Sequence, residues 1–257
     1  MRLICGDCLE VISHLGTFDC LVADPPDAIG LNYRGFNDKM SPGEYREFFW
    51  KCLALFIEHA GISWVSYNAK WTFMVGALVE RLLMERPDLE AKPFIQSFTF
   101  GQNRKTDCGN GHRPLLRLRH KDAPLYPEQI KIPSWRQLNG DKRAANGGRV
   151  PLDHWSEFPR VTGNSKQRRP HHPTQLHEGL VERCIKMSTK ENGSVLDVFS
   201  GTGTAIRVCR EIDRDCTSIE LSHFYCEKIA EEHGLELSIC DGDDPNTPTY
   251  QQCLLRA

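Results

Sequence analysis

The sequence predicts an α/β fold: a Rossmann-like, doubly wound and mostly parallel sheet, interrupted by an irregular basic insertion. First, short apolar runs alternate with stretches of helical periodicity, which is the pattern of parallel sheets. Second, two of the apolar runs end abruptly in rigid or glycine-rich turns, at Asp24 to Asp27 and at Ser200 to Thr204. Ligands of open α/β sheets bind at the carboxyl ends of the strands, where such turns lie.

The individual elements follow from these patterns. Ser41 and Pro42 mark one helix start, as N-cap and first helical residue. Strands are expected at residues 2–5, 18–23, 62–67, 94–100, 115–119, 194–199 and 216–219. Helices are expected from the turn at residues 6–8 to about 14, and at 42–60, 70–84, 175–187, 205–212 and 222–233.

The charge of the chain is unevenly distributed, although its formal net charge is only −2. Residues 101–170 hold 15 Lys and Arg against six Asp and Glu, a net +9, and the remainder carries −11. This stretch is rich in proline, with Trp135 and Trp155 interleaved, so we expect a basic insertion at 101–170 within a domain formed by 1–100 and 171–240. A loose tail is expected at 241–257. The basic block favours a nucleic acid partner, with a solvated charged loop as the alternative.

The composition also bears on compartment and metals. No apolar run is long enough to span a bilayer and no apolar leader opens the chain, so we expect no membrane association and a cytoplasmic, intracellular location. The 11 cysteines are scattered, and Cys20, Cys52, Cys184 and Cys209 are expected to be buried free thiols. One Cys-x-x-Cys pair, and Cys108 with His112, lack partners at ligand spacing. We therefore predict no metal.

The run from Val195 to Thr204 predicts a strand, a tight turn and a helix, an arrangement that brings backbone N–H groups to a ligand. Gly201 and Gly203 allow positive φ and close backbone approach. Glu220 follows 17 positions after Gly203, near the roughly 20-residue spacing at which an acidic residue meets the ribose of a nucleotide-like ligand. The motif is not a full G-x-G-x-x-G, and a purely structural turn is the alternative.

Asp24-Pro25-Pro26 predicts a rigid turn at the end of a buried strand, because two prolines cannot continue a sheet ladder. The Asp24 carboxylate and a carbonyl without local N–H partners are two fixed acceptors, which suit a substrate amine with two N–H bonds. An Asx-Pro turn is the alternative. Asp7 lies at a helix start, where it either caps the helix or accepts a hydrogen bond from a ligand amine.

Taken together and in this order, the motifs resemble the amino-group DNA methyltransferases that use S-adenosylmethionine, in the permuted order called the β class. The resemblance extends to orphan enzymes of phages or mobile elements and covers nearly all of residues 2–233. The matching runs are Gly6-Asp7-Cys8, Asp24-Pro25-Pro26, Gly111-His112-Arg113-Pro114, His172-Pro173-Thr174-Gln175, Asp197 to Thr204 and Ile219-Glu220-Leu221.

The resemblance implies a role for each run. Asp24 and the carbonyl of Pro25, within the catalytic run Asp24-Pro25-Pro26-Asp27, would hold the target amine of a flipped base. The cofactor would be held by Asp7, Cys8, His172, Thr174, Asp197, Phe199, Ser200, Gly201, Thr202, Gly203, Thr204 and Glu220. Nucleic acid would contact Tyr33, Phe36, Arg104, Lys105, His112, Arg113, Lys142, Arg143, Lys166, Arg168 and Arg169.

Asp27 departs from the family pattern, which has an aromatic residue that stacks on the flipped base. Such stacking is worth about 1–3 kcal/mol per base, and Tyr33, Phe36 and Trp71 are candidate substitutes. Leu176 and His177 also differ from the Lys-Pro common after the His-Pro-Thr-Gln run.

The favoured function is DNA adenine-N6 methylation, because the resemblance associates aspartate at position 24 with adenine more than with cytosine. Cytosine-N4 or RNA methylation, a non-catalytic nucleic-acid binder and a nucleotide-dependent oxidoreductase are the alternatives. The sequence leaves open whether the protein forms a homodimer.

Overall fold

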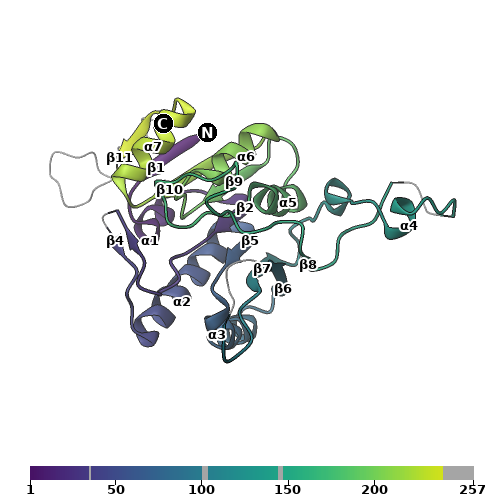
Figure 1. Cartoon of the computed structure of the whole chain (residues 1–257). Coiled ribbons are helices and arrows are strands. Elements are labelled where there is room, and N and C mark those ends of the chain that lie inside the picture. The colour runs from purple at the N-terminus through teal and green to yellow at the C-terminus, as the bar shows by residue number, and fades with distance from the viewer. Residues whose placement is uncertain (35, 100–103, 144–146, 240–257) are drawn as a thin grey trace.

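The computed structural model describes residues 1–34, 36–99, 104–143 and 147–239. In this part of the chain nine strands form one sheet in the order β11-β1-β10-β9-β2-β5-β7-β6-β8 (Figure 1). A separate hairpin pairs β3 with β4. The strands are β1 Arg2–Cys5, β2 Phe18–Ala23, β3 Asn32–Tyr33, β4 Phe36–Asn37, β5 Ala60–Ser66, β6 Leu89–Ser97, β7 His112–His120, β8 His154–Trp155, β9 Ser194–Asp197, β10 Asp215–Glu220 and β11 Leu237–Ile239.

The sheet is mostly parallel, as the alternating pattern predicts. The six strands from β11 to β5 are all parallel to their neighbours, whereas β7 runs antiparallel between β5 and β6. This confirms the predicted fold class.

Helices cover both faces of the sheet (Figure 1). Alternate residues of one strand face opposite sides: Leu21 packs in the core with α2 and α3, and Cys20 in the core with α5 and α6. Since both faces are covered, the central strand β2 is buried and apolar on both faces from Cys20 to Ala23. The helices are α1 Cys8–Val11, α2 Pro42–His59, α3 Thr72–Glu85, α4 Trp135–Leu138, α5 Glu178–Ser188, α6 Thr204–Glu211 and α7 His223–His233, and 3-10 turns lie at Ile12–His14, Ala69–Trp71 and Pro127–Ile130.

The predicted start of α2 is confirmed. The Ser41 hydroxyl accepts the Glu44 N–H at 3.3 Å, and the Glu44 carboxylate accepts the Ser41 N–H at 2.8 Å. Pro42 occupies the first turn, where its missing N–H costs nothing.

Several element boundaries differ from the prediction. β6 begins at Leu89, not at Phe94, because it pairs with β7 along nine residues and this ladder carries it through Lys92 and Pro93. Phe100, the expected end of that strand, lies outside the described residues. α5 begins at Glu178, not at Gln175, because the His177 side chain caps it. The two- and three-residue strands β8 and β11 are too short to show a periodic pattern.

Residues 101–170, expected to be an irregular insertion, contribute β7 and β8 to the main sheet. The division at residue 101 is therefore not a boundary between sheet and insertion. Beyond β7 the chain is irregular and extends an arm, described at residues 132–143 and 147–149, whose base is closed by two backbone hydrogen bonds between Ile132 and Arg149. α4 lies in this arm, which projects from the body of the protein (Figure 1). The expected tail at 241–257 lies outside the described residues.

Three further features concern the described residues only. Cys20, Cys52, Cys184 and Cys209 are buried free thiols, as predicted. None of the described helices has both the length and the apolarity needed to cross a bilayer. Within the same residues, no group of three or more His, Cys, Asp or Glu could hold a metal ion.

Candidate active site

A cavity of about 580 Å³ lies at the carboxyl ends of β1, β2, β9 and β10. The turns that follow these strands form its wall, together with the β3–β4 hairpin and the segment before α5. Its lining includes most of the predicted cofactor residues, namely Asp7, Cys8, His172, Thr174, Asp197, Phe199, Ser200, Gly201, Thr202, Thr204 and Glu220. The cavity volume is within the range of roughly 300–1,000 Å³ typical of small-molecule sites.

The glycine turn after β9 has the conformation that its sequence predicts. Gly201 and Gly203 have φ of 54° and 72°, the left-handed region that favours glycine. Gly203 is the N-cap of α6 and is not among the described residues that line the cavity. A Cβ there would lie 3.2 Å from Ile229, so Gly203 allows α6 to pack closely on α7.

Glu220 ties the end of β10 to this turn. Its two carboxylate oxygens accept the N–H groups of Gly201 and Ser222, each at 2.8 Å. Burial raises the pKa of Glu220, and these backbone hydrogen bonds oppose the rise. The acidic residue picked out by its spacing therefore does reach the glycine turn.

Asp197 is the most perturbed carboxyl group in the cavity wall. It is 5% exposed, and the Ser218 hydroxyl donates a hydrogen bond to it at 3.4 Å. Burial raises the pKa of Asp197 to about 7. The group therefore changes charge near neutral pH, where a bound cation would favour its ionised form.

His172 also lines the cavity, from the segment before α5. Its ring lies 5.4 Å from that of Tyr33 and 4.6 Å from that of Tyr225, and its Nδ1 donates to the Thr174 carbonyl. Burial lowers the pKa of His172 to about 4, so the imidazole is neutral at physiological pH. The turn at Pro170 to Gln175 thus lines the cavity, as predicted.

Asp7 caps the helix, as one of its two predicted readings has it, whereas its hydrogen bond to a ligand amine stays a prediction. Its Oδ1 accepts the Leu9 N–H at 2.9 Å as the N-cap of α1, and the residue also lines the cavity.

Asp24 and Pro26 line the cavity at the end of β2, whereas Pro25 and Asp27 are not among its described lining residues. Asp27 is 5% exposed, and its carboxylate pairs with Arg113 on β7. Arg113 Nη2 lies 2.7 Å from Asp24 Oδ1 and 3.0 Å from Asp27 Oδ1, and Nη1 lies 2.9 Å from Asp27 Oδ2. The two carboxylates of the Asp-Pro-Pro-Asp turn therefore share one guanidinium.

This ion cluster shifts the pKa values of its members. Burial raises the pKa of Asp24, as does the nearby Asp27, whereas the charge of Arg113 lowers it. Desolvation acts to lower the pKa of Arg113, but the two carboxylates more than offset it, so the net shift is upward. Arg113 consequently stays charged at all pH values of interest.

Arg113 was predicted to contact nucleic acid, but its guanidinium is committed to Asp24, Asp27 and Ser66. Arg117 and Arg119, also in the basic block, pair with Glu90 on β6. Part of the +9 charge is thus neutralised within the sheet, which no count of residues could reveal.

The other residues predicted to contact nucleic acid are spread over the surface. Tyr33 and Phe36 line the cavity. Arg169 is paired with Glu232 and Arg143 with Asp141, and Arg168 is half-buried. The remaining ones, Arg104, Lys105, His112, Lys142 and Lys166, are exposed. Of the whole set, only Tyr33 and Phe36 belong to the cavity.

The sequence patterns missed Arg34 and Tyr225, which also line the cavity. The Arg34 N–H donates to the Tyr225 hydroxyl at 3.3 Å, and its carbonyl accepts the Ser222 hydroxyl at 2.6 Å. These bonds tie the β3–β4 hairpin to the start of α7. Their partners lie about 190 positions apart, so no local pattern indicates them.

Comparisons with known proteins agree with this arrangement. A family described as DNA methylase matches residues 18–232. Over 261 aligned residues the chain is 28% identical to the type II methyltransferase M.HpaI of Haemophilus parainfluenzae, which covers 95% of this chain and 77% of that protein. It is 29% identical to M.BamHI of Bacillus amyloliquefaciens over 90% of this chain and 56% of that protein, less than two thirds of the relative's length. A solved structure titled PvuII DNA methyltransferase (cytosine-N4-specific) has the same fold, with a TM-score of 0.66 and 14% identity over 98% of this chain and 89% of that one.

Proposed function

The chain belongs to the DNA methylase family, and we propose that it transfers a methyl group from S-adenosylmethionine to the exocyclic amine of a flipped DNA base, most specifically adenine N6. The observation that carries this proposal is the position of Asp24. This carboxylate lies at the end of β2 and lines the cavity beside the glycine turn of β9.

The cavity fits the proposed cofactor in size and charge. Its described lining contains four carboxylates, Asp7, Asp24, Asp197 and Glu220, against Arg34 as the one lining residue of the Arg or Lys type. An acidic cavity suits a ligand with sulfonium and ammonium cations. We assign the ribose end to Glu220, the adenine end to Asp7 and the methionine end to Phe199, Ser200 and Gly201, with His172 and Thr174 closing the other side. When bound, S-adenosylmethionine supplies an electrophilic methyl group.

The protein's own contribution is to hold the target amine. An exocyclic base amine is a poor nucleophile, because its lone pair is delocalised into the ring. Asp24 and the Pro25 carbonyl accept its two N–H bonds, which favours a tetrahedral nitrogen whose lone pair points at the methyl group. The amine nitrogen would form a C–N bond to the methyl carbon while the bond between that carbon and the sulfonium sulfur breaks and leaves a neutral thioether, and the methylated amine would then give one proton to solvent. The base must leave the duplex to reach this cavity, at a cost of a few kcal/mol.

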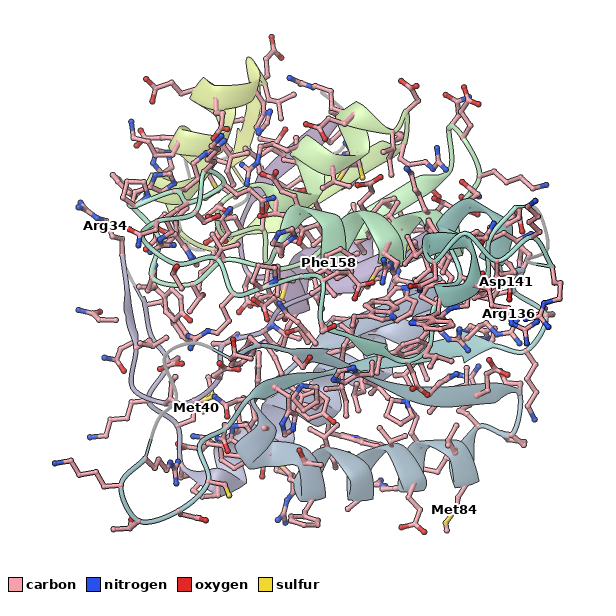
Figure 2. The ribbon with its side chains drawn as sticks, turned by 45° about the vertical axis from the view of Figure 1, so that its right-hand side comes forward. Arg34, Met40, Met84, Arg136, Asp141 and Phe158 are labelled. Carbon is pink, nitrogen blue, oxygen red and sulfur yellow. The ribbon has the colours of Figure 1, made fainter. Side chains whose placement is uncertain are left out.

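The basic part of the chain is proposed to contact DNA. The arm carries exposed Trp135 and Lys142, a ring and a cation that suit a base and a phosphate. Arg136 and Asp141 of the arm lie at one edge of the molecule, and Arg34, which borders the cavity, lies toward the other (Figure 2). A duplex that contacts both the arm and the border of the cavity would lie across the face of the molecule that Figure 2 shows.

The aspartate at position 27 suggests a second candidate function, a nucleic-acid-binding protein that no longer captures a flipped base and does not catalyse methyl transfer. The structure weakens the reason for it, because Asp27 is turned toward Arg113 and the rings of Tyr33, Phe36 and Phe48 line the cavity. These rings can stack on a flipped base in place of an aromatic residue at position 27. Trp71, the other candidate substitute, is held elsewhere: it stacks on Tyr45 and donates its indole N–H to the Asp27 carbonyl.

The test is to incubate the protein with methyl-labelled S-adenosylmethionine and mixed-sequence DNA, and to separate the nucleosides by mass spectrometry. The proposal predicts label in N6-methyladenine, and none with Asp24→Ala. Label in N4-methylcytosine would keep the mechanism and correct the base, and label only when RNA is supplied would correct the substrate. No label in any nucleoside, with cofactor binding intact, would contradict methyl transfer to nucleic acid.

A further inference from the structure

We propose that Arg113 is a positioning residue for methyl transfer: anchored by Asp27, it holds Asp24 as an anion and engages only one of its oxygens, so that the other can accept the substrate amine. This inference rests on the proposed function of Asp24. It assigns Asp27 a role that differs from base stacking, and it gives Arg113 a role in the reaction without contact to the substrate.

The geometry of the guanidinium supports this assignment. Nε donates to the Ser66 hydroxyl on β5, Nη1 donates to Asp27, and Nη2 donates to both Asp24 and Asp27. All three nitrogens are therefore engaged by groups fixed on β5 and on the turn after β2. A lysine ammonium cannot reproduce this planar fork.

The two carboxylates are bound in different ways. Asp27 receives two parallel bonds, one on each oxygen, which is the bidentate geometry that fixes an arginine most firmly. Asp24 receives one bond from the arginine, on Oδ1 at 2.7 Å, and a further hydrogen bond from the Ser66 side chain. Asp27 thus anchors the arginine, whereas Asp24 is oriented by it and keeps Oδ2, which the arginine does not engage, to accept a substrate N–H.

Asp27 is itself held by its surroundings. Its carbonyl accepts the Trp71 indole N–H at 2.7 Å, and its Oδ2 lies 3.5 Å from the Asn68 amide. It is 5% exposed and is not among the described residues that line the cavity, so its carboxylate is not placed to stack on or hold a base there. Asp27, which occupies the position of an aromatic residue in the family motif, therefore holds Arg113 in place.

The charges around Asp24 explain why the arginine is needed. Asp24 interacts electrostatically with Asp27 on the same turn, Arg113 on β7, the Tyr33 phenol of β3 and the Tyr45 phenol of α2, and Ser66 of β5 adds a hydrogen bond. Arg113 is the one cation in this set. Without it, the buried Asp27 carboxylate and the partly buried Asp24 carboxylate would face each other and one would take up a proton, as close carboxylates do. A protonated Asp24 is a weaker acceptor for an amine N–H.

The experiment compares four variants in a methyl-transfer assay at saturating cofactor, from pH 6 to pH 9.5, with cofactor affinity measured in parallel by calorimetry. Arg113→Gln should lower kcat by about 100-fold at pH 7, the loss that a small misplacement causes. It should also move the acid limb of the pH–rate profile upward by about one to three pH units, the effect of losing a neighbouring opposite charge. The affinity for S-adenosylmethionine should stay within about threefold of the wild-type value.

Asp27→Asn is a second test with the opposite expected shift, and it remains valid if the Arg113→Gln variant does not fold. It removes a negative neighbour of Asp24 but leaves Arg113, so the acid limb should move down and kcat should fall less, by about tenfold. Arg119→Gln is the matched control, because Arg119 lies on the same strand and pairs with Glu90. It should leave the profile in place.

Asp24→Ala distinguishes a failure of the proposed function from a failure of the role proposed for Arg113. If the wild type transfers no methyl group, or Asp24→Ala is as active as the wild type, the proposed function fails and this inference fails with it. If Asp24→Ala is inactive but Arg113→Gln keeps kcat within about threefold of the wild type and an unmoved acid limb, this inference alone is overturned. Equal shifts of the limb in Arg113→Gln and Asp27→Asn would also overturn it.

Discussion

The imidazole of His172 packs on the backbone of Gly201, so that a Cβ at Gly201 would lie 3.2 Å from its Cε1 and Nε2. This contact joins the His-Pro-Thr-Gln turn before α5 to the glycine turn after β9. The two motifs are about 30 residues apart, and both line the cavity.

Gly201→Ala should therefore damage the cofactor site. The new methyl group meets His172 at a residue with φ of 54°, where a non-glycine residue costs about 1–3 kcal/mol. We expect a loss of stability of that size in urea unfolding, and at least tenfold weaker binding of S-adenosylmethionine by calorimetry. Gly76→Ala, in α3 with open space around it, should instead stabilise the protein by about 0.5–1 kcal/mol. Unchanged cofactor affinity in Gly201→Ala would contradict the proposed site.

Asp197 predicts a pH dependence of stability. Its folded-state pKa of about 7 lies above the unfolded value near 3.9, so the folded state binds the proton more tightly. The associated stability is fully present below about pH 4 and is lost as the pH rises through 7, by no more than about 4 kcal/mol. Thermal melts without cofactor should show this fall in the wild type and a smaller one in Asp197→Asn. Parallel curves for the two proteins would refute the prediction.

Asp27→Tyr restores the aromatic residue of the family motif but should not restore function. The substitution leaves Arg113 without its bidentate partner and places a large ring in a buried site. Removal of one member of a buried ion pair lowers the free energy of unfolding by about 3 kcal/mol or more. We expect a lower Tm and lower kcat than in Asp27→Asn. Higher activity than the wild type would mean that position 27 does face the base.

Substitutions in the arm should weaken DNA binding without changing cofactor binding. Trp135→Ala should weaken DNA binding by about 1–3 kcal/mol, and Lys142→Ala should reduce the slope of log affinity against log salt by about one. Affinity for S-adenosylmethionine should not change. Arg81→Ala, on α3 and paired with Glu85, is the charge control. If both arm variants bind DNA as the wild type does over the whole salt range, the arm is not a DNA contact.

The sequence predicts those parts of the site whose functional residues are close together in one short segment of the chain. Asp24-Pro25-Pro26 and the turn at Ser200 to Thr204 each combine a strand end with residues that fix the backbone, so their position at the sheet edge could be predicted. Glu220 could be predicted from its spacing, because the helix and strand between it and Gly203 have standard lengths.

Features that depend on distant pairing could not be predicted in this way. Arg113 meets Asp24 across 89 positions because β7 runs antiparallel beside β5, and the sequence does not show where β7 pairs. An arginine within a basic block indicated nucleic acid, although its place on β7 pairs it with Asp24 and Asp27. Arg34 and Tyr225 were missed for the same reason.

The most direct test of the central claim is a single-turnover measurement. The protein is first mixed with methyl-labelled S-adenosylmethionine, and DNA is then added with excess unlabelled cofactor. The account predicts that the wild type transfers bound label to DNA, whereas Asp24→Asn binds the cofactor equally well and transfers it at least 100-fold more slowly. Transfer by Asp24→Asn at the wild-type rate would contradict the assignment of Asp24 as the acceptor that holds the amine.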